Sequence, residues 1–70
     1  MQNIRPHLHE ILNALAIVRG MTEGIEAGLT GEMEYTNEQL LDKIKRAFKA
    51  IDRIEAATEE VRALAHKEDS

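Results

Sequence analysis

Cysteine is absent from this chain, which excludes disulfide bonds and thiolate metal sites. No apolar run approaches the ~18 residues that a membrane span needs, and the first residues lack the charged and then apolar pattern of a signal peptide. The formal net charge is -4. Nucleic acids and anionic membranes bind best to basic surfaces, so this charge argues against either as the main partner. We therefore expect a cytoplasmic protein that binds neither nucleic acid nor a membrane.

Proline and glycine are few, and their positions mark where helices begin and end. The one proline, Pro6, is tolerated only in the first turn of a helix. The stretch "GLTGEMEYTN" holds two of the four glycines without sustained periodicity, which predicts a connecting turn. Thr36 and Gln39 have the spacing of a capping box, in which each side chain binds the backbone amide of the other residue. A second helix is expected to begin there.

Apolar residues on both sides of this turn recur in alternating steps of four and three, which is the pattern of a helical heptad seam. The first series is Ile4, Leu8, Ile11, Leu15, Val18, Thr22, Ile25 and Leu29. The second series is Leu40, Ile44, Ala47, Ile51, Ile54, Thr58, Val61 and Ala65. Further apolar residues widen both stripes, as is typical of helices in a bundle.

These patterns predict an all-α fold in which residues 1–70 form one antiparallel two-helix hairpin. We expect helix one at about 4–29, the turn at about 30–36 and helix two at about 37–66. A core of this size rarely supplies more than roughly 3–5 kcal/mol unless disulfides, a metal or a partner chain help. We therefore predict a homodimer in which two hairpins form a four-helix bundle.

The outward faces of the two helices differ in composition. On helix one the outward positions are mostly small or apolar, whereas those of helix two form an ordinary charged, solvated face. Gly20 and Gly24 lie on the small face, although glycine inside a helix costs about 1 kcal/mol relative to alanine. Two interpretations remain open: another helix of the same bundle covers this face, or a partner protein docks on it.

The stretch "HEILNALAIVRG" resembles the first helix of the dimerisation and phosphoacceptor domain of sensor histidine kinases. That pattern is H-E-[IL]-x-N-x-L, followed by apolar residues and by a glycine eleven positions after the histidine. The stretch "AIDRIEAATEEVRAL" resembles the second helix of that domain more loosely. The residues in register on the first helix are His9, Glu10, Ile11, Asn13, Leu15 and Gly20.

Two residues depart from the family pattern. Leu8 stands where a small residue usually precedes the histidine, and Ala14 stands where proline often follows the asparagine. Neither change touches the reactive groups. The 70 residues contain none of the asparagine-rich and glycine-rich boxes of the kinase ATP-binding domain, so no autokinase activity is expected.

The resemblance implies a role for three polar residues. His9 would carry a phosphoryl group on a ring nitrogen, which requires a neutral, exposed imidazole held in one tautomer, and Glu10 is the candidate carboxylate for holding it. Asn13, one turn further on, would bind phosphoryl oxygens or position a water molecule. In the resembled family the acidic residue and the residue three positions later form the phosphatase motif, here Glu10 with Asn13.

The expected partner is a response-regulator receiver domain or a histidine kinase. Hairpin pairing about a turn near position 33 places His9 level with the small residues Ala56, Ala57 and Thr58, which would leave room beside the ring. Ala16, Ile17 and Gly20 would extend this platform for a receiver helix.

Simpler interpretations stand beside this one, because an exposed histidine on a helix is usually only solvated, as we expect for His7 and His66. His7 and His9 differ by two residues and so point to opposite sides of a helix, which argues against a shared metal ion. No catalytic triad is present, and no cofactor is expected. Three functions remain: phosphotransfer or receiver phosphatase activity, a non-catalytic module that mimics a kinase domain, and a purely structural bundle.

Overall fold

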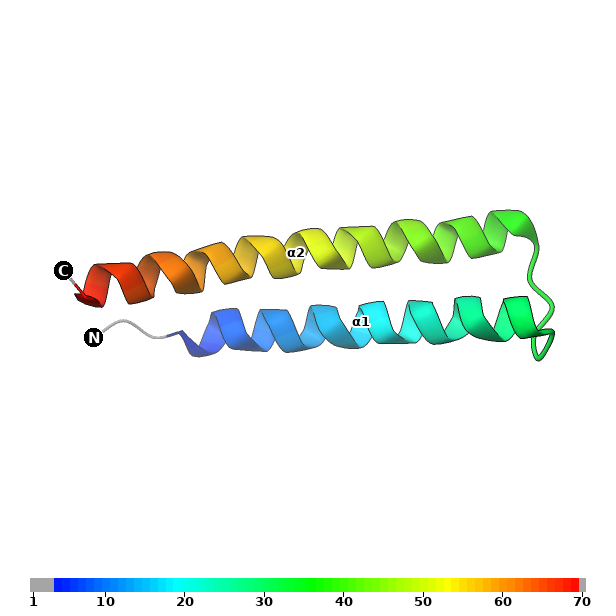
Figure 1. The fold of residues 1–70 in the computed structure, drawn as a ribbon, viewed down its shortest axis with the longest axis horizontal. Coiled ribbons are helices and arrows are strands. Elements are labelled where there is room, and N and C mark those ends of the chain that lie inside the picture. Colours follow the sequence, from blue (N-terminus) through cyan, green and yellow to red (C-terminus); the bar gives the residue numbers. More distant parts are fainter. Residues whose placement is uncertain (1–3, 70) are drawn as a thin grey trace.

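The protein is an all-α helical hairpin. The computed structural model describes residues 4–69, in which α1 (Arg5–Thr30) and α2 (Asn37–Asp69) run antiparallel and are joined by a short loop (Figure 1). The bounds of α1 differ from the expected ones by one residue at each end, and α2 extends three residues beyond the expected end. Within the described range, neither helix combines the length and the apolarity that crossing a membrane requires.

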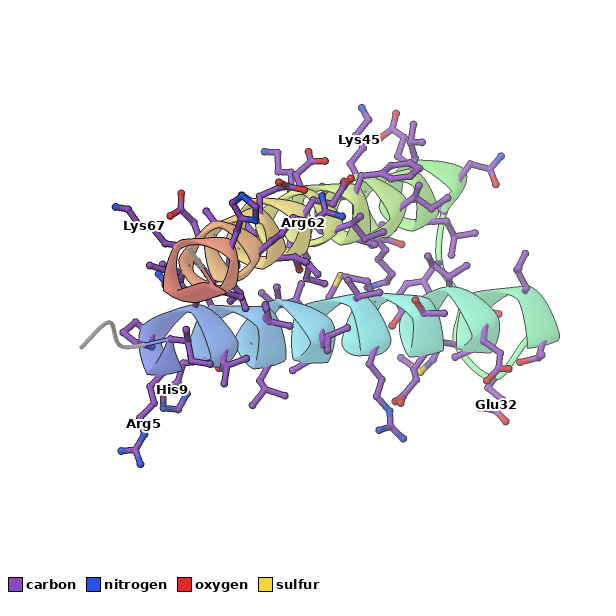
Figure 2. All side chains as sticks on the ribbon, turned by 60° about the vertical axis from the view of Figure 1, so that its left-hand side comes forward. Arg5, His9, Glu32, Lys45, Arg62 and Lys67 are labelled. Atoms are coloured by element: carbon purple, nitrogen blue, oxygen red, sulfur yellow. The ribbon has the colours of Figure 1, made fainter. Side chains whose placement is uncertain are left out.

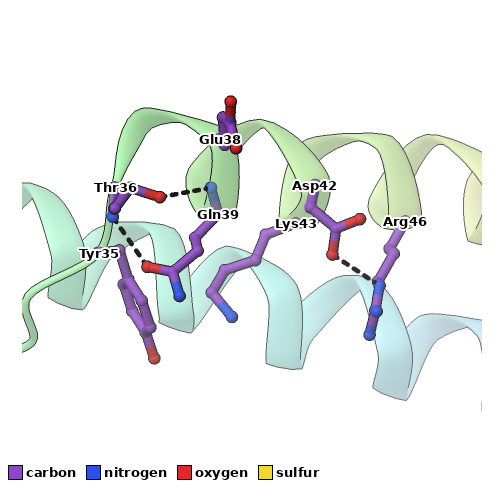
Figure 3. Close-up of a pocket in the computed structure, with 7 residues that line it drawn as sticks. All are labelled: Tyr35, Thr36, Glu38, Gln39, Asp42, Lys43 and Arg46. Carbon is purple, nitrogen blue, oxygen red and sulfur yellow. Dashed lines mark hydrogen bonds and ion pairs between the residues drawn. The ribbon is translucent and has the colours of Figure 1, made fainter.

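The loop is built by local hydrogen bonds. Gly31 ends α1 in the left-handed conformation (φ 87°), which glycine adopts without steric penalty, and the Met33 amide then donates to the Ala27 carbonyl oxygen at 3.1 Å. The predicted capping box is confirmed at the start of α2 (Figure 3). The Thr36 amide donates to Gln39 Oε1 at 2.8 Å, and the Gln39 amide donates to Thr36 Oγ1 at 3.1 Å.

The loop end of the hairpin is tightly packed. A Cβ atom added to Gly28 would lie 2.8 Å from Leu40 Cδ2 and 3.0 Å from Tyr35 Cδ2, so glycine allows α1 to approach these side chains. The Lys43 Nζ atom lies 4.5 Å from the centre of the Tyr35 ring, within the range of a cation–π contact. These contacts fix how the two helices meet next to the loop.

Alanines form the buried part of the contact between the helices. Among the described residues, the fully buried hydrophobic ones are Ala14, Ala50 and Ala57, and no large side chain is fully buried. The seam expected from the sequence is confirmed in part. Ile11, Val18 and Ile25 of α1 are half-buried, but Leu8, Leu15 and Leu29 are exposed. In place of these exposed residues, the contact in α1 uses the residues one position earlier: half-buried His7, buried Ala14, and half-buried Met21 and Gly28. Small side chains occupy the line of closest approach because they allow the two helix backbones to come close together.

The large hydrophobic side chains lie mainly on one exposed face. Residues that directly follow the contact line lie about 100° around each helix, and because the helices are antiparallel they share one side of the hairpin. We call this side the apolar face. It comprises Leu8, Leu15, Thr22 and Leu29 of α1 and Ile44, Ile51, Thr58 and Ala65 of α2, flanked by Ile4, Leu12, Leu41 and Phe48.

The shape of the hairpin explains why this face stays uncovered. The molecule measures 53 × 15 × 14 Å with a radius of gyration of 16.1 Å, whereas a compact chain of this length has a radius of gyration of about 11 Å. Two helices side by side have no third layer, so Leu12 (63% exposed) and Phe48 (62% exposed) remain in contact with solvent.

The two threonines of the apolar face satisfy their own hydroxyl groups. Thr22 Oγ1 donates to the Val18 carbonyl oxygen, and Thr58 Oγ1 donates to the Ile54 carbonyl oxygen, both at 2.7 Å. Each hydroxyl is thus bonded within its own helix and needs no water partner. Covering this face would leave neither hydroxyl proton unpaired.

We predict that Thr36→Ala lowers the free energy of unfolding by about 1 kcal/mol, because it removes the side-chain acceptor of the capping box. Urea denaturation followed by circular dichroism measures this change. Thr30→Ala, on the other side of the loop, is the matched control, since Thr30 Oγ1 makes only a 3.3 Å bond to Ala27 at the helix end. Equal effects of the two substitutions would contradict a specific contribution of the cap.

Candidate functional site

His9 lies on the outer side of α1, away from α2. It follows half-buried His7 of the contact line by two residues, and a two-residue step turns the side chain by about 200° around a helix. Figure 2 shows the ring projecting from α1 on the side opposite to α2, next to Arg5. The imidazole is exposed, as the resemblance requires. Ala16, seven residues later, shares this outer position.

A shallow hollow of about 300 Å³ adjoins the His9 ring. Arg5, Leu8, His9 and Leu12 line it, and we call it the His9 hollow. Leu8 and Leu12 also belong to the apolar face, so the hollow lies where that face meets the outer side of α1. Sequence reasoning did not single out Arg5, although its position four residues before His9 is the spacing that brings two side chains together on a helix.

Glu10 points toward α2 rather than toward His9. Its carboxylate forms an ion pair and a hydrogen bond with the guanidinium of Arg53, and both side chains are a little over 40% exposed. Among residues 4–69 the structure shows no hydrogen bond between Glu10 and the His9 ring. The ion pair joins the two helices about one turn from Ala56, which was expected to lie level with His9. The observed register of the helices therefore agrees with the expected register to about one turn. Ala57, however, is buried in the helix contact and leaves no open space.

The side of the hairpin opposite to the apolar face carries the other predicted residues. Asn13, Gly20 and Ala56 are exposed and directly precede the contact-line residues Ala14, Met21 and Ala57. They therefore share one face, and Asn13 lies one turn along α1 from His9. The structure thus brings Asn13, Gly20 and Ala56 to one side, with His9 and Ala16 at its outer edge.

A groove of about 460 Å³ runs between the helices on this same face. Its floor is apolar, from Ile17, Met21 and Ala50, and three cationic side chains form its α2 side; we call it the interhelix groove. The cations are Arg46, Lys49 and Arg53. Sequence analysis had assigned these cations to an ordinary solvated face. The signal it missed is spacing: Arg46, Lys49 and Arg53 recur every three to four residues beside the buried Ala50.

The three cations of the groove differ in their pairing. Arg46 Nε lies 2.9 Å from Asp42 Oδ2 (Figure 3), and Arg53 pairs with Glu10. Lys49 forms no ion pair with any side chain of residues 4–67, and so adds positive charge to the groove that no carboxylate of these residues neutralises. An anionic partner would find its strongest attraction there.

Gly20 and Gly24 have different surroundings. A Cβ atom added to Gly24 would lie 3.2 Å from Lys43 Cδ and Cε, so this glycine makes room for a side chain of α2. A Cβ atom added to Gly20 would have no atom within 4 Å. Packing within the hairpin accounts for Gly24 but gives no reason for glycine at position 20.

The described residues offer no metal site. No group of three or more histidine, cysteine, aspartate or glutamate side chains lies close enough to hold an ion within residues 4–67. His7 and His9 lie on different sides of α1, as the sequence indicated.

Comparisons with protein-family models, with curated proteins and with solved structures return no match to this chain. Any functional assignment therefore depends on the chain's own residues and on their resemblance to the histidine kinase pattern.

We predict that Gly20→Ala raises the free energy of unfolding by about 0.5–1 kcal/mol, because alanine favours the helix and meets no atom. Gly28→Ala is the matched control: its Cβ would collide with Leu40 and Tyr35, so its gain should be smaller or reversed. Thermal and urea denaturation of the two variants measure the difference. A destabilising Gly20→Ala would show that position 20 is packed more tightly than the hairpin indicates.

Proposed function

We propose that this chain is a two-component signalling protein, a homodimer whose His9 exchanges a phosphoryl group with a response-regulator receiver domain or whose surface promotes dephosphorylation of that domain. The observation that carries the proposal is the exposed pair of His9 and Asn13, one turn apart on α1. The sequence pattern around His9 and the hairpin fold both agree with the phosphoacceptor domain that the chain resembles.

The chemistry needs few protein groups. In transfer, a lone-pair nitrogen of the His9 imidazole attacks the phosphorus of the receiver's aspartyl phosphate, the bond from phosphorus to the aspartate oxygen breaks, and the carboxylate leaves; the reverse step returns the group. In the phosphatase alternative, the Asn13 amide orients a water molecule that attacks the phosphorus; the bond from phosphorus to the aspartate oxygen breaks, and the aspartate carboxylate and inorganic phosphate are released. Both routes need open access to the outer side of α1, which the exposure of His9 and Asn13 provides.

The receiver would dock on the face that holds Ile17, Gly20 and Ala56, together with Ala16 at its edge. The apolar floor of the interhelix groove supplies a hydrophobic contact, and the open space at Gly20 allows a helix to lie close to α1. Lys49 and Arg46 would attract carboxylates on the docking helix.

The dimer would form through the opposite side. The apolar face holds most of the exposed large hydrophobic side chains, and its two threonine hydroxyls are satisfied within their helices. A second copy would present the same face to it, as a two-fold interface requires. Two hairpins packed in this way form a four-helix bundle and leave both interhelix grooves exposed.

A non-catalytic interaction module is the second candidate, and one observation favours it. Glu10 is paired with Arg53, so within residues 4–69 no carboxylate holds the His9 ring in a single tautomer. A protein that only mimics the kinase surface needs the docking face and the dimer but no reactive ring.

We expect a dimer in sedimentation equilibrium, and we expect Leu15→Glu to make the chain monomeric because it places a charge in the middle of the apolar face. Ala63→Glu, an exposed position of α2 outside that face, is the control and should remain dimeric. A wild-type monomer at micromolar concentration would contradict the four-helix bundle.

The function is tested by mixing the chain with a panel of receiver domains from the same organism that carry labelled phosphate. Phosphotransfer predicts acid-labile label on this chain that disappears in His9→Gln and persists in His66→Gln, a matched exposed histidine of α2. Phosphatase activity instead predicts faster loss of receiver label without capture, reduced in Asn13→Ala. If every receiver keeps its phosphate at the uncatalysed rate but binds the chain, the non-catalytic module is correct.

A further inference from the structure

The interhelix groove lies on the side of the hairpin opposite to the apolar face. Its floor consists of Ile17, Met21 and Ala50, and none of the residues that line it belongs to the apolar face. A second copy that covered the apolar face would therefore leave the groove accessible. A helix in the groove can place apolar side chains on this floor, and it can approach α1 closely at exposed Gly20, where an added Cβ atom would have no atom within 4 Å.

Three side chains of α2 give the groove its positive charge, and they differ in how they are paired. Arg46 forms an ion pair with Asp42 (Figure 3). Arg53 forms an ion pair with Glu10. Lys49 lines the same groove but forms no ion pair with any side chain of residues 4–67. Of these three cations, Lys49 is therefore the one that can pair with a partner's carboxylate without displacing a carboxylate of this chain.

From this arrangement we infer that Lys49 selects the receiver domain by charge: the receiver helix that docks in the groove carries apolar residues for the floor and a carboxylate at the edge that faces Lys49. The inference rests on the receiver partner of the proposed function and deepens it, but it requires no chemistry at His9. Specificity is a difference of affinities, so the same lysine also acts against wrong partners. A receiver helix with a basic side chain at that edge would be repelled.

The test measures binding of the full chain to phosphate-free receiver domains from the same organism, by biolayer interferometry at low and at high salt. We expect Lys49→Glu to slow association with the receiver that binds the wild-type chain best by about tenfold at low salt, because a charge at the edge of an interface acts mainly on the association rate. High salt should reduce this difference, since it screens exposed charges. Circular dichroism checks that helix content is equal in all variants.

Lys45→Glu is the matched control. It makes the same change of charge on the same helix, but Lys45 does not line the groove and projects from α2 on the side away from α1 (Figure 2). Its effect on the association rate should therefore be clearly smaller than that of Lys49→Glu.

A charge exchange tests the pairing directly. Each exposed aspartate and glutamate on the helices of the receiver is changed to lysine in turn. We expect one of these changes to weaken binding to the wild-type chain and to restore binding to Lys49→Glu, because the two opposite charges have then exchanged places. If no such change restores binding, Lys49 does not face a carboxylate of the receiver and the inference is wrong.

Failure of this inference and failure of the proposed function give different results. If a receiver binds but Lys49→Glu associates as fast as the wild-type chain, or no more slowly than Lys45→Glu, the role of Lys49 is overturned while the receiver remains the partner. If no receiver of the panel binds the wild-type chain, both the receiver as partner and the role of Lys49 are wrong.

Discussion

The close approach of two helices along a line of alanines is the constraint on which the rest of this structure depends. Ala14, Ala50 and Ala57 are the residues that the hairpin buries, and alanine contributes little apolar area. Much apolar area of the large side chains therefore stays in contact with solvent in the single hairpin. A partner that covered the apolar face would bury this area. In the single hairpin many leucines and isoleucines stay exposed, although 43% of the 70 residues are hydrophobic.

The same line of alanines divides the hairpin into sides with different chemistry. One position after the line lie the large side chains of the apolar face, and one position before it lie the small and polar residues such as Asn13 and Gly20. Because the period of the line is seven residues, each side keeps its character along the length of the helices. The proposed dimer contact and the proposed docking contact could therefore be occupied at the same time, since they lie on opposite sides of a hairpin only about 15 Å thick.

Local signals in the sequence predicted the helices, the loop and the cap, because each depends on residues within four positions of one another. The capping box of Thr36 and Gln39 and the turn at Gly31 are examples. The sequence placed half of the helix contact correctly, at Ile11, Val18 and Ile25, and misplaced the other half by one residue. Periodicity gives most weight to the largest side chains, whereas the smallest side chains occupy the line of closest approach. The sequence predicted that His9 points outward. It did not predict that Arg53 pairs with Glu10 or that Arg5 and His9 line the same hollow. Those pairings depend on which sides of α1 and α2 face each other.

The pairing of Glu10 with Arg53 changes what a histidine at position 9 can do. A carboxylate beside a phosphorylated imidazole would repel the phosphoryl oxygens, and at close range that repulsion is large when the site is shielded from water. Glu10 is turned toward α2 and paired with Arg53, so its charge is directed away from the outer side of α1, where His9 lies. Glu10 thus links the two helices instead of holding the His9 ring. Under the proposed function, this pairing keeps the nearest carboxylate along the chain away from a phosphoryl group on His9, whichever way the group is later passed on.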